Sequence, residues 1–233
     1  MKRILGHIRR ADEKYGLIKS GDKIAVGLSG GKDSLVLLQA LCAYQKFGIK
    51  QFDVMAITVD CTNGKADYSK VAKFCQDLGI QYHIEPSQIF EIIFDVRKEK
   101  SPCSLCSKLR RGMLNSAAVT FKCNKVALAH HGDDLIETLL LSMTHEGRMS
   151  TLQPLSYLDK TDLTLIRPLL FATEREIVAV ARDLPVLENP CPVNHKTRRE
   201  YMKKLVAQLD SDIGGARGRM LDAIICSDRY NLF

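Results

Sequence analysis

The sequence has 233 residues, of which 45% are hydrophobic and 26% are charged, and its formal net charge is +7. A chain of this length and composition can bury the core of one globular domain with appended helices. It contains no run of 18 apolar residues, which argues against a transmembrane helix, and its basic residues 1–10 lack the apolar core of a signal peptide. We therefore expect a cytoplasmic protein with no membrane partner. The positive charge suits a polyanionic partner such as nucleic acid.

Strand-like and helix-like segments alternate along the chain. Short apolar runs predict strands at 23–28, 52–60, 81–85, 125–129 and 163–167, the last of them at a sheet edge. Helical spacing predicts helices at 1–20, 32–47, 67–78, 133–144, 173–182, 196–209 and 216–225. This alternation is typical of the α/β class, with a parallel sheet covered by helices on both faces. We divide the chain into an N-terminal basic helix (1–22), a central domain (23–172) and a C-terminal helical extension (173–233).

Polar motifs follow three of the predicted strands, directly after Leu28, Val59 and Ala129. The carboxyl ends of parallel strands meet at one edge of a sheet, and ligands of α/β proteins bind there. The sequence therefore predicts one binding site at this edge. Val59 alone is also compatible with ordinary core packing.

The first motif, Ser29-Gly30-Gly31-Lys32-Asp33-Ser34, joins a strand to a helix. Two glycines let the backbone approach a bulky anion, and the free N–H groups at a helix start favour a phosphate. The serine hydroxyls add donors and Lys32 adds a positive charge. The spacing differs from that of a Walker A loop. A glycine-rich turn before a charged helix start is the alternative interpretation.

Eight cysteines occur, and in a cytosolic chain of this size we do not expect them to form a disulfide framework. Cys42, Cys75 and Cys226 lie in apolar helical patterns and are predicted to be core residues. Cys103 and Cys106 differ, because they form a C-x-x-C motif at a predicted helix start that is followed by basic residues. The helix dipole and these cations favour thiolates there.

Cys191, which stands between two prolines, is the candidate for a third sulfur ligand. A structural zinc ion needs four ligands, and His195 is a possible fourth. An iron–sulfur cluster can be held by three cysteines with one iron left open. A redox dithiol, or thiols that bind nothing, are further alternatives. The residues alone leave these interpretations open.

The second acidic motif is His130-His131-Gly132-Asp133-Asp134. Adjacent carboxylates at a strand end are costly unless they meet a cation, so they are candidates for Mg²⁺ binding. Asp133 is also a candidate acid or base, and His130 a candidate contact to adenine or substrate. The alternative interpretation is that Asp133 caps the following helix.

Basic residues gather in three segments, two of which flank the predicted site. Such groups hold phosphates of RNA without reading its sequence, although solvated helix faces are the more common fate of single basic residues. Arg110 is the candidate catalytic member, because it lies one helical turn past Cys106. The residues of these segments are Lys2, Arg3, Arg9, Arg10, Lys98, Lys100, Lys108, Arg110, Arg111, Lys196, Arg198, Arg199, Lys203 and Lys204.

Four features together resemble a known family: the basic N-terminal helix, SGGKDS at 29–34, PCSLCSKLRRG at 102–112 and AHHGDD at 129–134. They are similar to the tRNA 2-thiocytidine synthetase group of PP-loop ATP pyrophosphatases, and the likeness extends over about residues 1–199. The family fold is of the adenine nucleotide alpha hydrolase type. Gly132 departs from the family pattern, where a basic residue is common, and Asn194 stands where a further cysteine is often found.

The resemblance implies ATP-dependent, iron–sulfur-dependent thiolation of a tRNA base, with cytidine as the expected base. A 4Fe–4S cluster would be held by Cys103, Cys106 and Cys191, and Asp33 would hold Mg²⁺ or position groups around the phosphates. The implied catalytic residues are Asp33, Arg110, Asp133 and Cys191. The implied ATP-binding residues are Gly27, Leu28, Ser29, Gly30, Gly31, Lys32, Asp33, Ser34, Val59, His130 and Asp134.

The implied partners are tRNA and a sulfur donor such as a cysteine desulfurase or free sulfide, and a homodimer is expected because family members commonly form one. Two other functions stay open. One is a PP-loop enzyme that transfers sulfur or amidates another base or a small molecule. The other is a zinc-stabilised nucleotide-binding module without catalysis.

Overall fold

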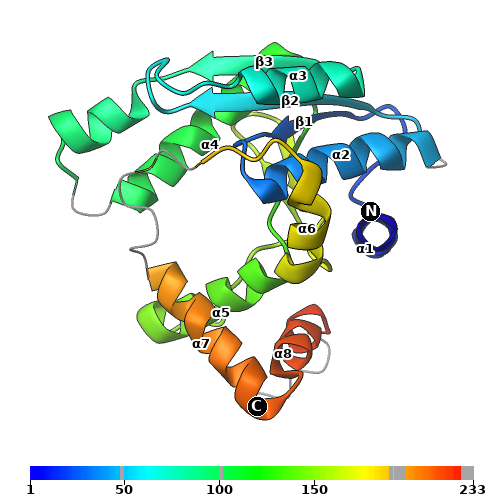
Figure 1. Cartoon of the computed structure of the whole chain (residues 1–233), viewed down its shortest axis with the longest axis vertical. Coiled ribbons are helices and arrows are strands. Elements are labelled where there is room, and N and C mark those ends of the chain that lie inside the picture. Colours follow the sequence, from blue (N-terminus) through cyan, green and yellow to red (C-terminus); the bar gives the residue numbers. More distant parts are fainter. Residues whose placement is uncertain (48–49, 100–101, 189–190, 192–197, 227–233) are drawn as a thin grey trace.

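The computed structural model of the chain describes residues 1–47, 50–99, 102–188, 191 and 198–226. Within them, strands form one sheet in the order β3-β2-β1-β4-β6-β5 (Figure 1). Neighbouring strands are parallel except β5 and β6, which are antiparallel. The predicted α/β sheet is therefore confirmed, as a mostly parallel one. The strands are β1 (Lys23–Gly27), β2 (Asp53–Asp60), β3 (Gln81–Pro86), β4 (Lys125–Ala127), β5 (Leu155–Leu158) and β6 (Leu163–Ile166).

The predicted edge position of the strand at 163–167 is wrong. β6 lies between β4 and β5, and β5 occupies the edge of the sheet. β5 has four residues and alternates exposed with half-buried positions. It therefore lacks the continuous apolar run that is typical of a strand buried on both faces.

Helices cover both faces of the sheet. The predicted helix at 1–20 ends five residues early, because Gly16 adopts a left-handed φ of 63° and its N–H caps the Asp12 carbonyl. The predicted helix at 196–209 begins outside the described residues and is seen from Arg198 onward. The helices are α1 (Lys2–Tyr15), α2 (Lys32–Phe47), α3 (Ser69–Leu78), α4 (Pro102–Thr120), α5 (Gly132–Glu146), α6 (Glu174–Val180), α7 (Arg198–Ile213) and α8 (Ala216–Ile225), with a π-helical turn at Glu91–Val96 and a 3₁₀ turn at Ala181–Asp183.

Alternate residues of the central strands enter two separate cores. Ile24 and Val26 of β1 pack with α1, α2 and α3, whereas Ala25 between them packs with α4. This is the period of two expected for a strand buried on both faces. Cys42 and Cys75 are in the first core, as predicted. Cys226 is half-buried at the end of α8, so its predicted core position is wrong.

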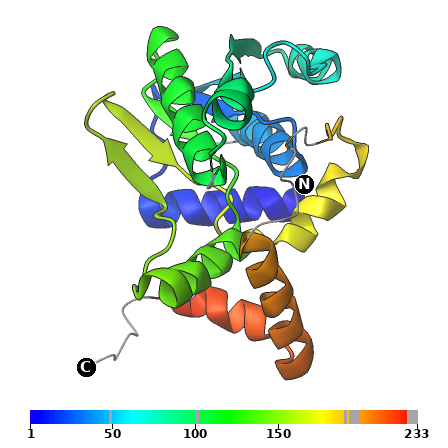
Figure 2. The same cartoon turned by 90° about the vertical axis from the view of Figure 1, so that its left-hand side faces the viewer.

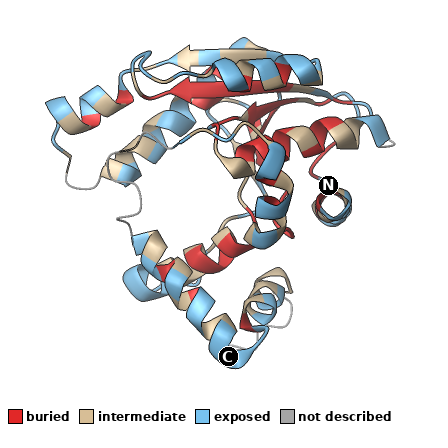
Figure 3. Cartoon of the chain, viewed as in Figure 1, coloured by how far each residue is buried: buried red, intermediate tan, exposed pale blue. Residues whose placement is uncertain are grey.

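The helices α5, α7 and α8 pack against one another beside the sheet (Figure 2). Buried residues concentrate on β1, β2 and α2, and few occur on α7 and α8 (Figure 3). The helices α1 and α6 instead contact each other and α2. The boundaries proposed at 22 and 172 stay a prediction. Among the described residues, no helix has the length and apolarity needed to cross a bilayer.

Gly132 fits the close packing at the start of α5. A Cβ atom at this position would lie 2.7 Å from Leu221 of α8 and 3.1 Å from the carbonyl oxygen of Ala172. A larger residue here would require the Leu221 side chain to rotate and the Ala172 carbonyl to shift slightly. The absence of a side chain at Gly132 thus allows α8 to pack closely on α5.

Ion pairs and a hydrogen bond connect α7 to α5. Arg199 lies 2.9 Å from an Asp134 oxygen and 3.4 Å from a Glu137 oxygen, and it donates to the Thr138 hydroxyl. Burial raises the pKa of Glu137 to about 7, and the charge of Asp134 adds to this effect. The folded chain therefore binds this proton more tightly than the unfolded chain does.

This raised pKa makes the stability of the chain dependent on pH. Stability from Glu137 is fully present below its unfolded pKa of about 4.5 and is lost as the pH rises through its folded pKa near 7. We expect Glu137→Gln to gain about 2 kcal/mol relative to the native chain between pH 5 and pH 8, measured by urea unfolding. The exposed Glu13→Gln variant controls for the loss of one carboxylate. Parallel pH profiles for Glu137→Gln and the native chain would contradict the assignment.

Candidate active site at the carboxyl edge of the sheet

The glycine-rich loop is anchored to β2 where it leaves β1. The Leu28 N–H donates to the Ile57 carbonyl at 2.8 Å, and the Thr58 hydroxyl donates to the Leu28 carbonyl at 2.6 Å. β1 therefore continues its pairing with β2 into the first residue of the loop. The backbone reaches Ser29 in a fixed direction, which sets where the loop turns.

Serine hydroxyls close the loop around its own backbone. The Ser34 hydroxyl donates to the Gly31 carbonyl at 2.9 Å and accepts the Ser29 N–H at 3.2 Å. The Ser29 hydroxyl lies 3.2 Å from that of Ser34 and accepts the Gly31 N–H at 3.3 Å. These bonds hold the turn just before the first residue of α2, the place where helix N–H groups attract an anion.

Gly30 meets two requirements that exclude a side chain. Its φ is +78°, and a Cβ atom would lie 2.8 Å from the Leu187 side chain. The Leu187 N–H also donates to the Gly30 carbonyl at 2.9 Å. The segment that leads to Cys191 therefore lies directly on the glycine-rich loop.

A pocket of about 350 Å³ opens beside this loop. It is bounded by the ends of β1, β2 and β4 and by one side of α4, so the predicted meeting of polar motifs at one edge is confirmed. The lining includes nine of the predicted site residues: Gly27, Leu28, Ser29, Asp33, Ser34, Val59, Arg110, His130 and Asp134. Gly30, Gly31, Lys32, Asp133 and the three predicted cysteine ligands do not line it.

Asp33 has an unsatisfied oxygen in this region. Its Oδ1 is buried and accepts no hydrogen bond of good geometry, although Lys32 Nζ lies 3.1 Å away and His131 Nε2 lies 3.7 Å away. The same Lys32 amine lies 3.2 Å from Glu174 of α6. Lys32 is therefore held beside the loop by two carboxylates. A buried carboxylate oxygen without a donor is suited to a cation.

The two carboxylates of the second acidic motif have different surroundings. Asp134 lines the pocket and accepts the His131 N–H at 2.9 Å, which caps the start of α5. Asp133 is 2% exposed, accepts the Glu174 N–H at 2.7 Å and pairs with Arg217. The alternative interpretation, in which Asp133 caps α5, is therefore wrong. His131 is the N-cap residue, Asp134 accepts its N–H in a capping box, and Asp133 accepts the first N–H of α6.

Charges around the motif determine its protonation. Burial alone would raise the pKa of Asp134, but His131, His130, the backbone N–H and Arg199 outweigh this effect and hold the pKa below its ordinary value. Burial lowers the pKa of His130 to about 4. Asp134 is therefore ionised and His130 neutral at pH 7.

Cys103 and Cys106 lie in the first turns of α4, and Cys191 is close enough to influence the Cys103 thiol. Burial raises the pKa of Cys103, and the nearby Cys191 and Cys106 raise it further. Cys106 has another neighbour, Cys61 after β2, whose hydrogen bond is the main cause that lowers the pKa of Cys106 to about 7, assisted by Arg110. Ser107 and Arg110, which follow on the same helix, line the pocket. Cys191 is thus an electrostatic neighbour of Cys103, and its role as a third ligand stays a prediction.

The donor set distinguishes between the metal interpretations. Within the part of the chain that the structure describes, no three His, Cys, Asp or Glu side chains are gathered closely enough to hold one metal ion. A single zinc ion needs four such ligands at bond distance. A cluster spreads its thiolates over different irons and needs only three. Cys103, Cys106 and Cys191 provide the three thiolates that a cluster needs, and their assignment as its ligands stays a prediction. His195 lies outside the described residues.

Two basic residues of α7, Arg199 and Lys203, form ion pairs within the protein. Arg199 binds α5, and Lys203 lies 2.6 Å from Glu174. Arg10 of α1 stacks over Phe171. Arg110 and Arg111 instead face the pocket from α4. Lys100 and Lys196 lie outside the described residues.

Several residues in or near the site are not predicted from the sequence. Arg111 lines the pocket but is recognised only as part of a basic segment, and Arg167, which contacts the pocket residue His130, only as the end of a strand. Cys61 and Leu187, which lie next to Cys106 and Gly30, carry no motif. The sequence signal that could have found Arg167 is its position directly after a strand, at the edge where the other polar motifs were expected.

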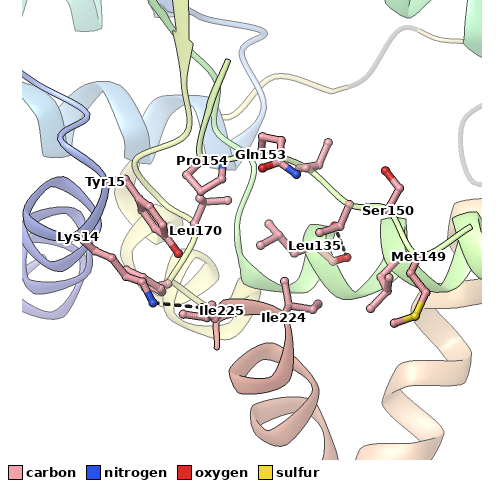
Figure 4. Close-up of a pocket in the computed structure, with 14 residues that line it drawn as sticks. Lys14, Tyr15, Leu135, Met149, Ser150, Gln153, Pro154, Leu170, Ile224 and Ile225 are labelled. Atoms are coloured by element: carbon pink, nitrogen blue, oxygen red, sulfur yellow. Dashed lines mark hydrogen bonds between the residues drawn. The ribbon is translucent and has the colours of Figure 1, made fainter. Parts of the chain in front are cut away.

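A second cavity, of about 600 Å³, lies away from the glycine-rich loop (Figure 4). It is enclosed by the ends of α1 and α8, one side of α5 and residues 149–154. Its lysine, Lys14, donates to the Ile225 carbonyl at 3.1 Å. Among the described residues that line it, the titratable ones are Lys14 and Tyr15.

Comparison with known proteins agrees with this geometry. A PP-loop domain family matches residues 5–209. A tRNA-cytidine(32) 2-sulfurtransferase of Geobacter sulfurreducens is 36% identical over 228 residues, covering 96% of this chain and 89% of the relative. The chain belongs to this PP-loop family. A 2-sulfurtransferase of the same name from Pelobacter propionicus is 38% identical over 230 residues, covering 96% of this chain and 85% of that one.

Solved structures show the same fold. The U34-tRNA thiolase NcsA from Methanococcus maripaludis, solved with its [4Fe-4S] cluster, matches this PP-loop chain with a TM-score of 0.76 and 26% identity over 95% of this chain and 76% of that one. An NH3-dependent NAD synthetase from Campylobacter jejuni matches with a TM-score of 0.54 and 19% identity, over 96% of this chain and 91% of that chain. The second likeness shows a shared fold alone.

The Gly30 geometry predicts the effect of one added methyl group. Gly30→Ala should destabilise the chain by about 2–3 kcal/mol, because it combines a left-handed φ with overlap on Leu187. Adding Leu187→Ala should recover part of the loss by removing the overlap, as measured by urea unfolding. Gly31→Ala is the matched control, since a Cβ atom there meets only the Ser29 hydroxyl at 3.4 Å. Equal losses at both glycines would disprove this account.

Proposed function

We propose that this chain is an ATP-dependent sulfurtransferase that replaces the 2-oxygen of a tRNA cytidine with sulfur. The observation that carries the proposal is that one pocket is lined both by the PP-loop and by the helix that bears the C-x-x-C motif. The names of the 36% and 38% identical relatives support tRNA cytidine as the substrate.

The loop would bind the phosphates and release pyrophosphate. In this proposal the base oxygen attacks the α-phosphorus of ATP, the bond to the β-phosphate oxygen breaks, and pyrophosphate leaves along the loop. Ser29, Ser34 and the N–H groups at the start of α2 stabilise the charge of that leaving group. Replacement of the adenylated oxygen by sulfur then releases AMP. Arg110 faces this reaction from α4.

A magnesium ion would bind at Asp33. The buried Oδ1 without a hydrogen-bond donor supports this assignment, since Mg²⁺ typically takes one or two carboxylates together with phosphate oxygens. Asp133 has both oxygens bound by Glu174 and Arg217, so its role would be to fix α6 and α8 against α5.

Cys103, Cys106 and Cys191 would hold a 4Fe–4S cluster. Such a cluster, held by three thiolates, supplies an open iron that can carry the sulfur to be transferred. The chain's own contribution is to keep the thiolates beside the pocket. Arg110 and the Cys61 hydrogen bond favour the thiolate form of Cys106.

The enzyme would also interact with tRNA, with a sulfur donor and with a second copy of itself. Arg110 and Arg111 would contact tRNA phosphates at the pocket mouth. The sulfur would come from a cysteine desulfurase or from free sulfide. The enzyme would act as a homodimer in the cytoplasm, where tRNA is modified.

A variant of Cys191 tests cluster binding separately from nucleotide binding. Cys191→Ala should lose the cluster and thiolation while its affinity for ATP stays within about two-fold, because Cys191 does not line the nucleotide pocket. The measurements are iron and sulfide content after anaerobic purification, thiolation of tRNA, and ATP titration. Cys226→Ala, at the end of α8, is the matched control. Full thiolation by Cys191→Ala would remove this residue from the site, and a colourless native protein with one zinc would favour a nucleotide-binding module.

The substrate is tested in the cell. Nucleosides of total tRNA from a deletion strain should lack 2-thiocytidine, and the native gene should restore it. Mass spectrometry of the digested tRNA provides the measurement. If every thiolated nucleoside remains, the tRNA proposal fails, and a small-molecule acceptor becomes the favoured substrate.

A further inference from the structure

His130 and Arg167 meet at the ends of two adjacent parallel strands. β4 pairs with β6, and the Leu128 N–H still donates to the Ile166 carbonyl just beyond the last pair. Two residues after Leu128 comes His130, which lines the pocket. Arg167 directly follows β6, and its Nε donates to Nδ1 of His130 at 3.2 Å.

This contact determines which ring nitrogen of His130 carries the proton. The arginine Nε–H can only donate, so Nδ1 of the histidine must accept with its lone pair. A neutral imidazole has one N–H, which must then be on Nε2. The opposite tautomer would place two N–H groups against each other.

The surroundings of both residues keep this arrangement fixed. Arg167 is 7% exposed, and its guanidinium also donates to the Gln153 carbonyl. Burial lowers the pKa of Arg167 to about 10, with a further contribution from Arg111, so it stays charged at pH 7. The half-buried ring of His130 has Asp134, Arg167, Arg199 and His131 as charged or titratable neighbours, and its pKa of about 4 leaves it neutral.

We propose that Arg167 is a positioning residue that locks His130 as a neutral Nε2–H donor, and that this donor binds an oxygen acceptor of the ligand in the pocket. His130 is then not the general base of the reaction, because its basic nitrogen is covered by Arg167. The acceptor is a phosphate oxygen of the nucleotide or the carbonyl oxygen of the base. This choice of ligand rests on the proposed function, whereas the tautomer does not.

The tautomer is measured directly on the native chain. Long-range ¹H–¹⁵N correlation of ¹⁵N-histidine-labelled protein at pH 7 should show His130 as the neutral, Nε2-protonated form. The His130→Gln variant assigns its signals, and the exposed His145 serves as the internal reference. An Nδ1-protonated or doubly protonated ring would overturn the proposal. This outcome does not depend on whether the chain thiolates tRNA.

Two separate ligands then identify the acceptor. α,β-Methylene-ATP alone should shift the His130 Nε2–H signal if a nucleotide oxygen is the acceptor, and unmodified tRNA transcript alone should shift it if the base is. A signal unmoved by either ligand, or by both together, would refute the donor role.

Variants test the two residues by their effect on thiolation. The side-chain amide introduced by His130→Gln would place an N–H near the position of Nε2–H. This variant should therefore retain at least about ten-fold more activity than His130→Leu, the range expected for one hydrogen bond to a reacting group. Arg167→Met should bring the second tautomer into the spectrum and lower the rate similarly. Thermal melts identify any variant that fails to fold, and equal loss in His130→Gln and His130→Leu, with both folded, would count against the donor.

Discussion

Parallel pairing of β1 with both β2 and β4 is the constraint on which the site depends. Strands that run the same way end at the same edge, so the residues after Gly27, Asp60 and Ala127 cannot be far apart. The glycine-rich loop, Cys61 and His130 follow these three ends. A one-residue shift in the register would reverse the side chains of a strand and disrupt both cores at once. The buried alternation of Ile24, Ala25 and Val26 therefore fixes the site as well as the fold.

The sequence predicts what depends on local patterns. The SGGKDS loop, the strand before it and the helix after it all carry strong local signals, and the structure has them as expected. Cys103 and Cys106 are likewise joined by one helix turn. A site shared with Cys191 is expected only through the family resemblance, because no local pattern relates residues 85 positions apart.

Three features that sequence reasoning missed depend on tertiary contacts. From the sequence, Asp133 could cap its own helix. In the structure it instead accepts the Glu174 N–H of α6 and pairs with Arg217 of α8. β5 has no apolar run because it lies at the edge. Arg167 carries no motif, and its importance arises only when β6 lies beside β4. Pairings between distant elements decide these roles.

The hydrogen bond from the Leu187 N–H to the Gly30 carbonyl limits how far Cys191 can lie from the glycine-rich loop. Four residues of chain, even fully extended, span at most about 14 Å. The Cα atom of Cys191 is therefore within about 14 Å of the Cα atom of Leu187, which is hydrogen-bonded to the glycine-rich loop. The covalent chain therefore keeps the backbone of Cys191 close to the loop that we propose binds the phosphates.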